Sequence, residues 1–374
     1  MMELSNTATT YQTILPGQTI GIIGGGQLAR MMALEAKAMG YKVITLEPTP
    51  NCPCAQVCDM QITAAYDDMD AIKKLAELSD VITYEFENID YEALTYLEKN
   101  AHLPQGSYVL KTTQHRFREK SAIKNMGIPV PNFHLVPSLD ELNEIVFYPS
   151  VLKTTTLGYD GKGQAVLKSE ADFPSSVDTE CILEEWMPFS KEVSVIVCRS
   201  VTGETSVFPV SENIHVNNIL HLSIVPARIS KEVEAKAINC ARKIAEDLNA
   251  IGLLAIEMFV VNDEIYINEL APRPHNSGHY TIDSCTTSQF EQHVRAVCAL
   301  PLGEVKQYSP VVMVNILGQH MKDLTKYLPM LKNGKLHLYG KADAVHNRKM
   351  GHVNLIGNID ESLETIEKSG IWNK

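Results

Sequence analysis

Residues 153–164 read KTTTLGYDGKGQ, and this stretch does most to decide the fold. Lys153 stands at the end of an expected strand and leads into a loop that holds three glycines and a second lysine, Lys162. Glycine lets a backbone approach a ligand closely and adopt positive φ, and an ammonium group pairs with phosphate oxygens. The stretch therefore predicts a loop that closes over a polyphosphate. A solvated hairpin loop is the simpler alternative, but it leaves the clustered lysines unexplained.

Upstream of this loop, short apolar runs alternate with helical periodicity. Strands are expected at residues 19–23, 42–46 and 81–84, with apolar residues at helical spacing between them. This βαβαβ order predicts a parallel sheet. The first strand runs into the turn Gly24-Gly25-Gly26, which could bring a helix N-terminus close to a phosphate.

The glycine turn also supports a different interpretation, a dinucleotide-binding Rossmann domain. Glu47 follows the second strand, where an acidic side chain can accept hydrogen bonds from the ribose hydroxyls of NAD. On this hypothesis the chain is an NAD-dependent dehydrogenase. Pro48 and the rest of the chain do not complete that fingerprint, which short glycine runs often match by chance. A nucleotide-binding module without catalysis is a further alternative.

Beyond the first three strands, the pattern changes to one dominated by strands. A helical stretch that begins near Thr112 and carries Arg116 ends at the sequence GIPVP, which indicates a boundary. Strands are expected at residues 148–153, 164–167, 181–186, 192–199 and 205–210, and an amphipathic helix at 233–248. The tail from about Pro310 holds further short strands and is consistent with a small third domain. Together these patterns predict an α/β and α+β multidomain protein.

Length, charge and composition limit the number of domains and the classes of partner that this chain can have. A chain of 374 residues exceeds the roughly 250–300 at which a single core stops growing, so two or three domains are expected. The formal net charge of -12 argues against nucleic acid as a partner. No apolar run approaches the roughly 18 residues of a membrane span, and residues 1–18 carry no export signal, so a cytoplasmic location is expected. Cys52, Cys54 and Cys58 cluster without a fourth metal ligand, which favours burial over zinc binding.

Two glutamates indicate a metal site. Glu257 interrupts an apolar strand at residues 253–261, and Glu269 follows the second strand of an expected hairpin, residues 264–268. Carboxylates combined with substrate phosphates suit Mg²⁺. A three-residue loop would place Glu257 opposite Glu269, whereas a two-residue loop would place it opposite Asn268, so the metal hypothesis requires the three-residue loop. An ordinary salt bridge is the alternative.

Two later stretches are rich in cationic and hydrogen-bonding side chains. The stretch APRPHNSGH carries Arg273 and His275, which could stabilise negative charge that develops during group transfer. The stretch YGKADAVHNRKMGH is basic in an acidic chain, and its Lys341 and Arg348 could hold the monophosphate of a nucleotide. Structural histidines and a solvated basic face are the ordinary alternatives, and the other motifs weigh against them.

Taken in order, five motifs resemble those of N5-carboxyaminoimidazole ribonucleotide synthetases, a family of the ATP-grasp superfamily. They are GGGQL, GYDGKGQ, NELAPR, HNSGH and residues 341–352 of the basic stretch, and they begin at Gly24, Gly158, Asn268, His275 and Lys341. The middle motifs are generic to ATP-grasp enzymes, whereas the first and the last two are particular to this family. The resemblance runs through almost the whole chain.

The resemblance implies a protein of three parts. They are a Rossmann-like N-terminal domain at residues 1–112, an ATP-grasp region at 113–305 with a lid at about 125–190, and a small β-rich C-terminal domain at 306–374. ATP would lie between two antiparallel sheets. The glycine turn would then belong to the domain that binds the other substrate.

The resemblance also implies site residues. Those expected to bind ATP are Arg116, Lys153, Gly158, Tyr159, Asp160, Gly161, Lys162, Gly163, Gln164, Glu184, Glu185, Trp186, Met187, Glu192, His215, Asn268 and Glu269. Those expected to bind the imidazole ribonucleotide are Gln27, Tyr159, Asp160, Arg273, His275, Lys341 and Arg348, the last two at its phosphate. Asp160, Arg273 and His275 would be catalytic, and Glu257 and Glu269 would hold Mg²⁺.

The implied reaction is the carboxylation of 5-aminoimidazole ribonucleotide at the expense of ATP and bicarbonate. Carboxyphosphate would form as the intermediate, and ADP and phosphate would be released. Positioning, charge stabilisation and lid closure would carry such a reaction. A formate-dependent glycinamide ribonucleotide transformylase of the same superfamily is the nearest alternative. The partners would be these small molecules and a second copy of the chain in a homodimer, with neither nucleic acid nor membrane.

Overall fold

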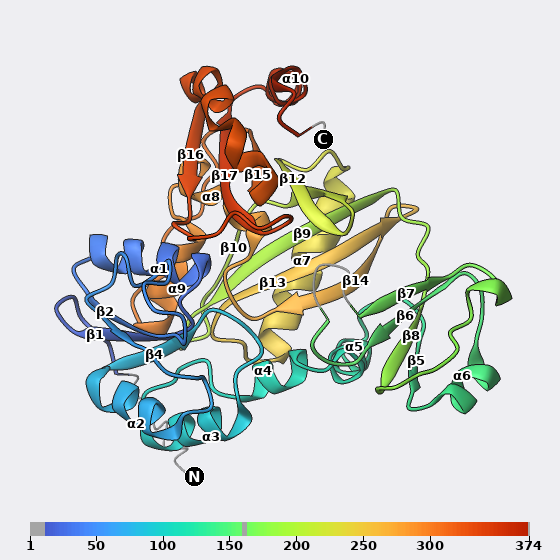
Figure 1. The fold of residues 1–374 in the computed structure, drawn as a ribbon, viewed down its shortest axis with the longest axis horizontal. Helices are drawn as coiled ribbons and strands as arrows, with labels where there is room; N and C mark the ends of the chain where they lie inside the picture. Colours follow the sequence, from blue (N-terminus) through green and yellow to red (C-terminus); the bar gives the residue numbers. More distant parts are fainter. Residues whose placement is uncertain (1–11, 159–162, 373–374) are drawn as a thin grey trace, which may run out of the picture.

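The structure is a computed structural model that describes residues 12–158 and 163–372 (Figure 1). It is a mixed α/β and α+β protein, as the sequence predicts. A four-stranded parallel sheet, a four-stranded antiparallel sheet and a nine-stranded antiparallel sheet form its framework. In the part of the chain that the structure describes, no helix combines the length and apolar character needed to cross a membrane.

The N-terminal part is the parallel sheet with helices on both faces, at the left of Figure 1. Its strands are β1 (Thr19–Ile23), β2 (Lys42–Leu46), β3 (Met60–Ile62) and β4 (Val81–Tyr84), and its helices are α1 (Gln27–Ala38), α2 (Met69–Leu78) and α3 (Tyr91–Asn100). Side chains of β1 alternate between two cores: Ile20 and Ile22 pack with α1, whereas Ile23 packs with α2 and α3. The predicted βαβαβ unit is therefore confirmed, and β3 adds a fourth strand in the order β3-β2-β1-β4.

Three of the shorter helices join this part to the rest of the chain. They are α4 (Tyr108–Thr113), α5 (Arg116–Asn125) and α9 (Gln289–Val297). Phe290, Val294 and Val297 of α9 lie in the same apolar core as α1. Buried apolar contact between segments more than 250 residues apart in sequence holds the glycine turn, which starts α1, close to the central part.

A second sheet projects to the right in Figure 1. Its strands are β5 (Phe133–Val136), β6 (Ser150–Thr154), β7 (Gln164–Leu167) and β8 (Cys181–Glu185), in the order β5-β8-β6-β7. Helix α6 (Leu139–Ile145) and the short η1 (Glu170–Asp172) complete it. The glycine-rich loop after Lys153 joins β6 to β7, and within it residues 159–162 lie outside the described residues.

The largest sheet runs through the centre of the molecule to its C-terminal end. Its strands are β9 (Lys191–Arg199), β10 (Thr205–Val207), β11 (Ser211–Val216), β12 (Ile219–Val225), β13 (Gly252–Val261), β14 (Glu264–Ala271), β15 (Val311–Leu317), β16 (Gly334–Leu338) and β17 (Lys349–Ile356). The order is β14-β13-β9-β11-β12-β15-β17-β16, with β10 also paired to β9. The amphipathic helix α7 (Lys231–Asp247) lays Val233, Ala237, Ala241 and Ile244 on this sheet.

The C-terminal strands continue the central sheet, because β15 pairs with β12. The remaining helical segments are η2 (Asn276–Gly278), α8 (Thr281–Ser284), η3 (Gly318–Lys332) and α10 (Ile359–Ser369). Tyr327 of η3 and Ile366 of α10 pack with these strands in a core of their own. The C-terminal segment thus has an apolar core of its own, but its strands belong to the same sheet as the central part.

The hairpin of β13 and β14 opposes the two metal-ligand candidates in a way that its turn length alone does not predict. Its turn has two residues, Asn262 and Asp263, both with positive φ, and Val261 pairs directly with Glu264. The turn expected at residues 262–263 is therefore confirmed, whereas the condition that opposing Glu257 to Glu269 requires a three-residue loop is wrong. A bulge in β14 at Asn268 nevertheless shifts the register so that Glu257 lies opposite Glu269.

Candidate active site

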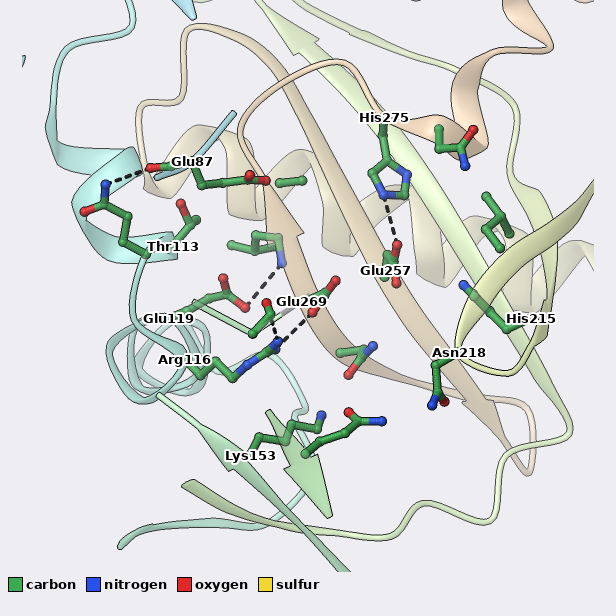
Figure 2. Close-up of a pocket in the computed structure, with 18 of the residues that line it drawn as sticks. Glu87, Thr113, Arg116, Glu119, Lys153, His215, Asn218, Glu257, Glu269 and His275 are labelled. Atoms are coloured by element: carbon green, nitrogen blue, oxygen red, sulfur yellow. Dashed lines mark hydrogen bonds and ion pairs between the residues drawn. The ribbon is translucent and has the colours of Figure 1, made fainter. Parts of the chain in front are cut away.

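A cavity of about 620 Å³ lies where the N-terminal part, the projecting sheet and the central sheet meet (Figure 2). The predicted site residues that line it are Gln27, Arg116, Lys153, Gly158, Gln164, Glu184, Glu185, Trp186, Met187, Glu192, His215, Glu257, Asn268, Glu269, Arg273 and His275. Gly163, Lys341 and Arg348 are described but do not line it. Tyr159, Asp160, Gly161 and Lys162 lie outside the described residues.

One wall of the cavity carries two lysines on a single buried glutamate. Glu184 is the penultimate residue of β8, and its Oε2 lies 2.8 Å from Nζ of Lys153 and 3.3 Å from Nζ of Lys120. Burial alone would raise the pKa of Glu184, but the two ammonium groups outweigh it and lower the pKa to about 2. Glu184 is therefore charged, and its Oε1 has no hydrogen-bond partner in the structure.

Arg116 connects the base of the loop to the central sheet. Its guanidinium lies 3.0 Å from Glu269 Oε2 and donates to the Gly158 carbonyl at 3.3 Å (Figure 2). One helical turn later, Glu119 is buried and accepts a hydrogen bond from the Leu270 N–H at 3.2 Å. Burial, followed by the nearby charge of Glu269, raises the pKa of Glu119 well above its usual value.

The second metal-ligand candidate is paired with a histidine. Oε1 of Glu257 lies 3.0 Å from Nε2 of His275 (Figure 2). Burial raises the pKa of Glu257, but His275 and then His215 outweigh it and lower the pKa to about 2. On the next strands His215 is hydrogen-bonded to Glu192. Burial would lower the pKa of His215, yet the Glu192 carboxylate raises it above its usual value.

Arg273 closes the side of the cavity that faces the N-terminal part. Its Nε lies 2.6 Å from Oε1 of Glu87, a residue in the segment after β4. The carbonyl of Glu87 accepts a hydrogen bond from Gln114 at 2.7 Å, which fixes that segment against α4. Arg273 thus contacts the segment that follows β4 of the parallel sheet, and it can present its remaining N–H groups to an anion.

The glycine turn is already occupied by carboxylates of the chain itself. Gly25 N donates to Glu47 at 3.0 Å, and Gly26 N and Ala29 N donate to the buried Glu85 at 2.5 and 2.8 Å. Glu47 is also hydrogen-bonded to Tyr66 and is not free for a ribose. The start of α1 therefore offers a pyrophosphate none of these N–H groups, which removes the support for the NAD interpretation.

The basic stretch lies beside the N-terminal part, and of its residues Lys349 lines the cavity. Gly340 accepts a hydrogen bond from Gln56 at 2.8 Å, and the ammonium group of Lys341 lies 5.8 Å from the ring centroid of Tyr339. Arg348 is exposed and donates to the Asp343 carbonyl at 3.2 Å. Lys341 and Arg348 are not among the residues that line the cavity, although the charge of Lys341 acts on Glu85, which does line it.

Several cavity residues were not predicted from the sequence. They are Glu85, Phe86, Glu87, Asn88, Thr113, Gln114, Glu119, Phe189, Asn218, Phe259 and Lys349, among others. Glu119 could have been found, because it lies three residues from Arg116 on the same helix face. Phe189 and Phe259 stack at 4.7 Å between ring centroids, but they are seventy residues apart and share no local signal.

Comparison with known proteins agrees with this architecture. The model of the ribonucleotide synthetase preATP-grasp domain matches residues 17–114, that of the ATP-grasp domain residues 121–290, and that of the phosphoribosylaminoimidazole carboxylase C-terminal domain residues 311–366. The N5-carboxyaminoimidazole ribonucleotide synthase of Bacillus subtilis is 54% identical over 92% of this chain and 93% of its own length. That of Staphylococcus aureus is 42% identical over 91% and 93%.

Solved structures give the same result. The ADP complex of an N5-carboxyaminoimidazole ribonucleotide synthetase has a TM-score of 0.94 and 60% identity, over 97% of this chain and 99% of the other. The Aspergillus clavatus enzyme in complex with ADP and 5-aminoimidazole ribonucleotide has a TM-score of 0.88 and 30% identity, over 94% and 97%. This chain belongs to the N5-carboxyaminoimidazole ribonucleotide synthase family, within the ATP-grasp superfamily.

Proposed function

We propose that this protein is an ATP-dependent ligase that carboxylates the exocyclic amine of 5-aminoimidazole ribonucleotide with bicarbonate, in purine biosynthesis. The observation that carries the proposal is the meeting, in one cavity, of two opposed carboxylates and the cationic base of a glycine-rich loop. The carboxylates are Glu257 and Glu269, and the cations are Lys153 and Arg116. A carboxylate pair beside cations suits the handling of a metal-bound triphosphate.

The nucleotide is proposed to lie between the projecting sheet and the central sheet. Lys153 and Arg116 would face its phosphates, and the segment 184–187 its base. The unpartnered Oε1 of Glu184 supports this, because a buried charged acceptor without a donor is costly unless a ligand supplies one. Glu192 would accept hydrogen bonds from the ribose, with His215 holding its carboxylate in place.

Glu257 and Glu269 are proposed to hold Mg²⁺, and the donor set fits that ion. Both are carboxylates, they lie opposite each other, and the low pKa of Glu257 keeps it charged at neutral pH. Asn268 adds a buried amide oxygen that has no hydrogen-bond partner. When bound, the ion would neutralise phosphate charge and orient the γ-phosphate.

The other substrate is proposed to lie toward the N-terminal part. Gln27, Arg273 and His275 line that side of the cavity, and the proposal extends to Tyr159, Asp160, Lys341 and Arg348, which the family motif assigns to the same ligand. Lys341 and Arg348, which lie outside the cavity lining, would bind its phosphate.

The proposed reaction proceeds through carboxyphosphate. Bicarbonate oxygen attacks the γ-phosphorus, the bond to the β-phosphate oxygen breaks, and ADP leaves. Carboxyphosphate then yields carbon dioxide and phosphate, and the substrate amine attacks the carbon and loses a proton to form the carbamate. Arg273 and His275 would stabilise the negative charge that develops on the transferred oxygens, with Asp160 as a third catalytic group. Enclosure by the loop would keep water from the intermediate.

Further properties are proposed on the strength of the family. They are the division into residues 1–112, 113–305 with a lid at about 125–190, and 306–374, a cytoplasmic location and a homodimer. The matched ranges 121–290 and 311–366 lie within the second and third segments, and 17–114 extends two residues beyond the first, which supports the division.

The test is phosphate release from MgATP with the two other substrates added singly and together. We expect release to require 5-aminoimidazole ribonucleotide and bicarbonate together. Replacing bicarbonate by formate and the imidazole by glycinamide ribonucleotide should abolish it. Stimulation by the formate pair instead would identify the transformylase, and ATP binding without any turnover would refute the ligase.

A further inference from the structure

A series of buried hydrogen bonds starts at His275 and runs into the central sheet. Nδ1 of His275 lies 2.8 Å from Ser277 Oγ, which accepts a hydrogen bond from Ser194 Oγ at 2.7 Å. Asn213 Nδ2 donates to Ser194 Oγ at 2.9 Å, and Ser223 Oγ donates to Asn213 Oδ1 at 2.9 Å. The series therefore crosses β12, β11 and β9 before it reaches the loop after β14.

These polar side chains are buried and do not line the cavity. Ser277 and Ser223 are 0% exposed, Ser194 is 1% exposed and Asn213 is 6% exposed. Four polar side chains in the core of a sheet are costly unless they are fully hydrogen-bonded, and apolar residues would pack there at lower cost. Since none of the four meets a ligand directly, their effect on the site passes through His275.

The donors and acceptors in the series point in one direction. The amide nitrogen of Asn213 can only donate, so Ser194 Oγ accepts there. Ser194 donates its single proton to Ser277 Oγ, and at its 2.7 Å contact with Ser211 Oγ it therefore accepts from Ser211. Ser277 Oγ is then left with its own proton for Nδ1 of His275. The Ser277 backbone N–H also donates to that nitrogen, at 3.3 Å.

This direction determines the tautomer of His275. A ring nitrogen that accepts two hydrogen bonds carries no proton, so the proton of the neutral ring is on Nε2. Nε2 then donates to Glu257 Oε1 at 3.0 Å. The backbone is fixed as well, because Gln289 of α9 accepts from His275 N at 2.9 Å and donates to its carbonyl at 2.8 Å.

We propose that Ser277 and Ser194 are positioning residues that hold His275 as the Nε2-protonated tautomer, with that proton directed at Glu257. Asn213 and Ser223 set the direction of the series. The consequence for catalysis rests on the proposed function, whereas the tautomer does not depend on it. A ring that lost this restraint could turn its proton to Nδ1 and leave the Glu257 carboxylate without its donor.

The test combines kinetics with ¹⁵N NMR of the full-length protein labelled at histidine. The variants are Ser277→Ala and Ser194→Ala, with His275→Gln to assign the His275 signals. The matched control is Ser284→Ala, since Ser284 is also 0% exposed but lies outside the series and donates to the Tyr280 carbonyl at 3.1 Å. In the unaltered protein, Nδ1 should show the shift of an unprotonated ring nitrogen and Nε2 that of a protonated one.

We expect kcat to fall about tenfold in Ser277→Ala and about threefold in Ser194→Ala, with the KM for ATP nearly unchanged. The Nδ1 and Nε2 shifts of His275 should move toward each other in both variants and stay in place in Ser284→Ala. Unchanged shifts in Ser194→Ala, or a protonated Nδ1 in the unaltered protein, would overturn the inference. If Ser277→Ala does not fold, Ser194→Ala decides the question, because it lies one hydrogen bond further from the ring. Should the ligase itself be refuted, the NMR result still stands alone.

Discussion

Glu184 should matter far more for stability than either lysine that it binds. Glu184→Gln removes the negative charge beside Lys120, which is 1% exposed, and leaves its ammonium group with neutral acceptors such as the Ile267 carbonyl at 3.4 Å. Removing one partner of a buried pair costs about 3–5 kcal/mol, because the other charge stays buried. Lys120→Met leaves Glu184 paired with Lys153 at 2.8 Å, so we expect a loss of about 1 kcal/mol or less.

Thermal unfolding measures this difference. For 374 residues at about 2.1 cal/mol/K each, the unfolding entropy is roughly 0.8 kcal/mol/K, so Glu184→Gln should lower Tm by about 4–6 °C and Lys120→Met by about 1 °C. The double variant should recover most of the loss, because the remaining Lys153 is 13% exposed and reaches water. The reasoning is refuted if Lys120→Met is as destabilising as Glu184→Gln, or if the double variant is no better than Glu184→Gln.

Four further outcomes are expected. Burial holds the pKa of His279 and His352 well below the usual value, so the unfolded chain binds more protons and stability in urea should fall as pH drops below about 6.5; greater stability at pH 5 than at pH 7 would contradict this. Glu269→Gln should abolish phosphate release and weaken Mg²⁺ binding measured by titration, and turnover at the unaltered rate would exclude the metal role. Lys341→Ala should raise the KM for the ribonucleotide about tenfold with little change for ATP, and an equal change for both would contradict the proposed phosphate contact. A hydrogen bond from Cys54 lowers the pKa of the half-buried Cys58 to about 7, so iodoacetamide should alkylate Cys58 first at pH 7.5, as peptide mass spectrometry can show.

The sequence predicted the elements whose signals are local. The strands at residues 19–23, 42–46 and 81–84 were placed correctly because each is an apolar run bounded by turn residues. Helix α7 followed from its spacing of apolar residues. The strand expected at 205–210 ends at Val207 in the structure, since Pro209 has no N–H for a sheet.

What the sequence could not show are the partners that lie far apart in the chain. Lys120 lies on helix α5 and Glu184 on strand β8 of the projecting sheet, and no periodicity in the sequence links the two residues. The same holds for Glu85. Its carboxylate accepts hydrogen bonds from N–H groups at the start of α1, where the glycine turn had suggested a phosphate site. A tertiary contact therefore changes the interpretation of this local motif. The helix N-terminus does bind an anion, but that anion is a side chain of the protein itself.

The hairpin shows the limit of reasoning from loop length alone. Side chains alternate along a strand, so a two-residue turn and a regular ladder would place Asn268 opposite Glu257 and put Glu269 on the other face. The turn does have two residues, yet one extra residue in β14 restores the pairing of the two carboxylates. A bulge costs ladder regularity, and a simple hairpin has no need of one at this position. The bulge lies beside Glu257 and Glu269, which indicates that this strand pair must hold the two carboxylates opposite each other. Either a longer turn or a bulge can do so.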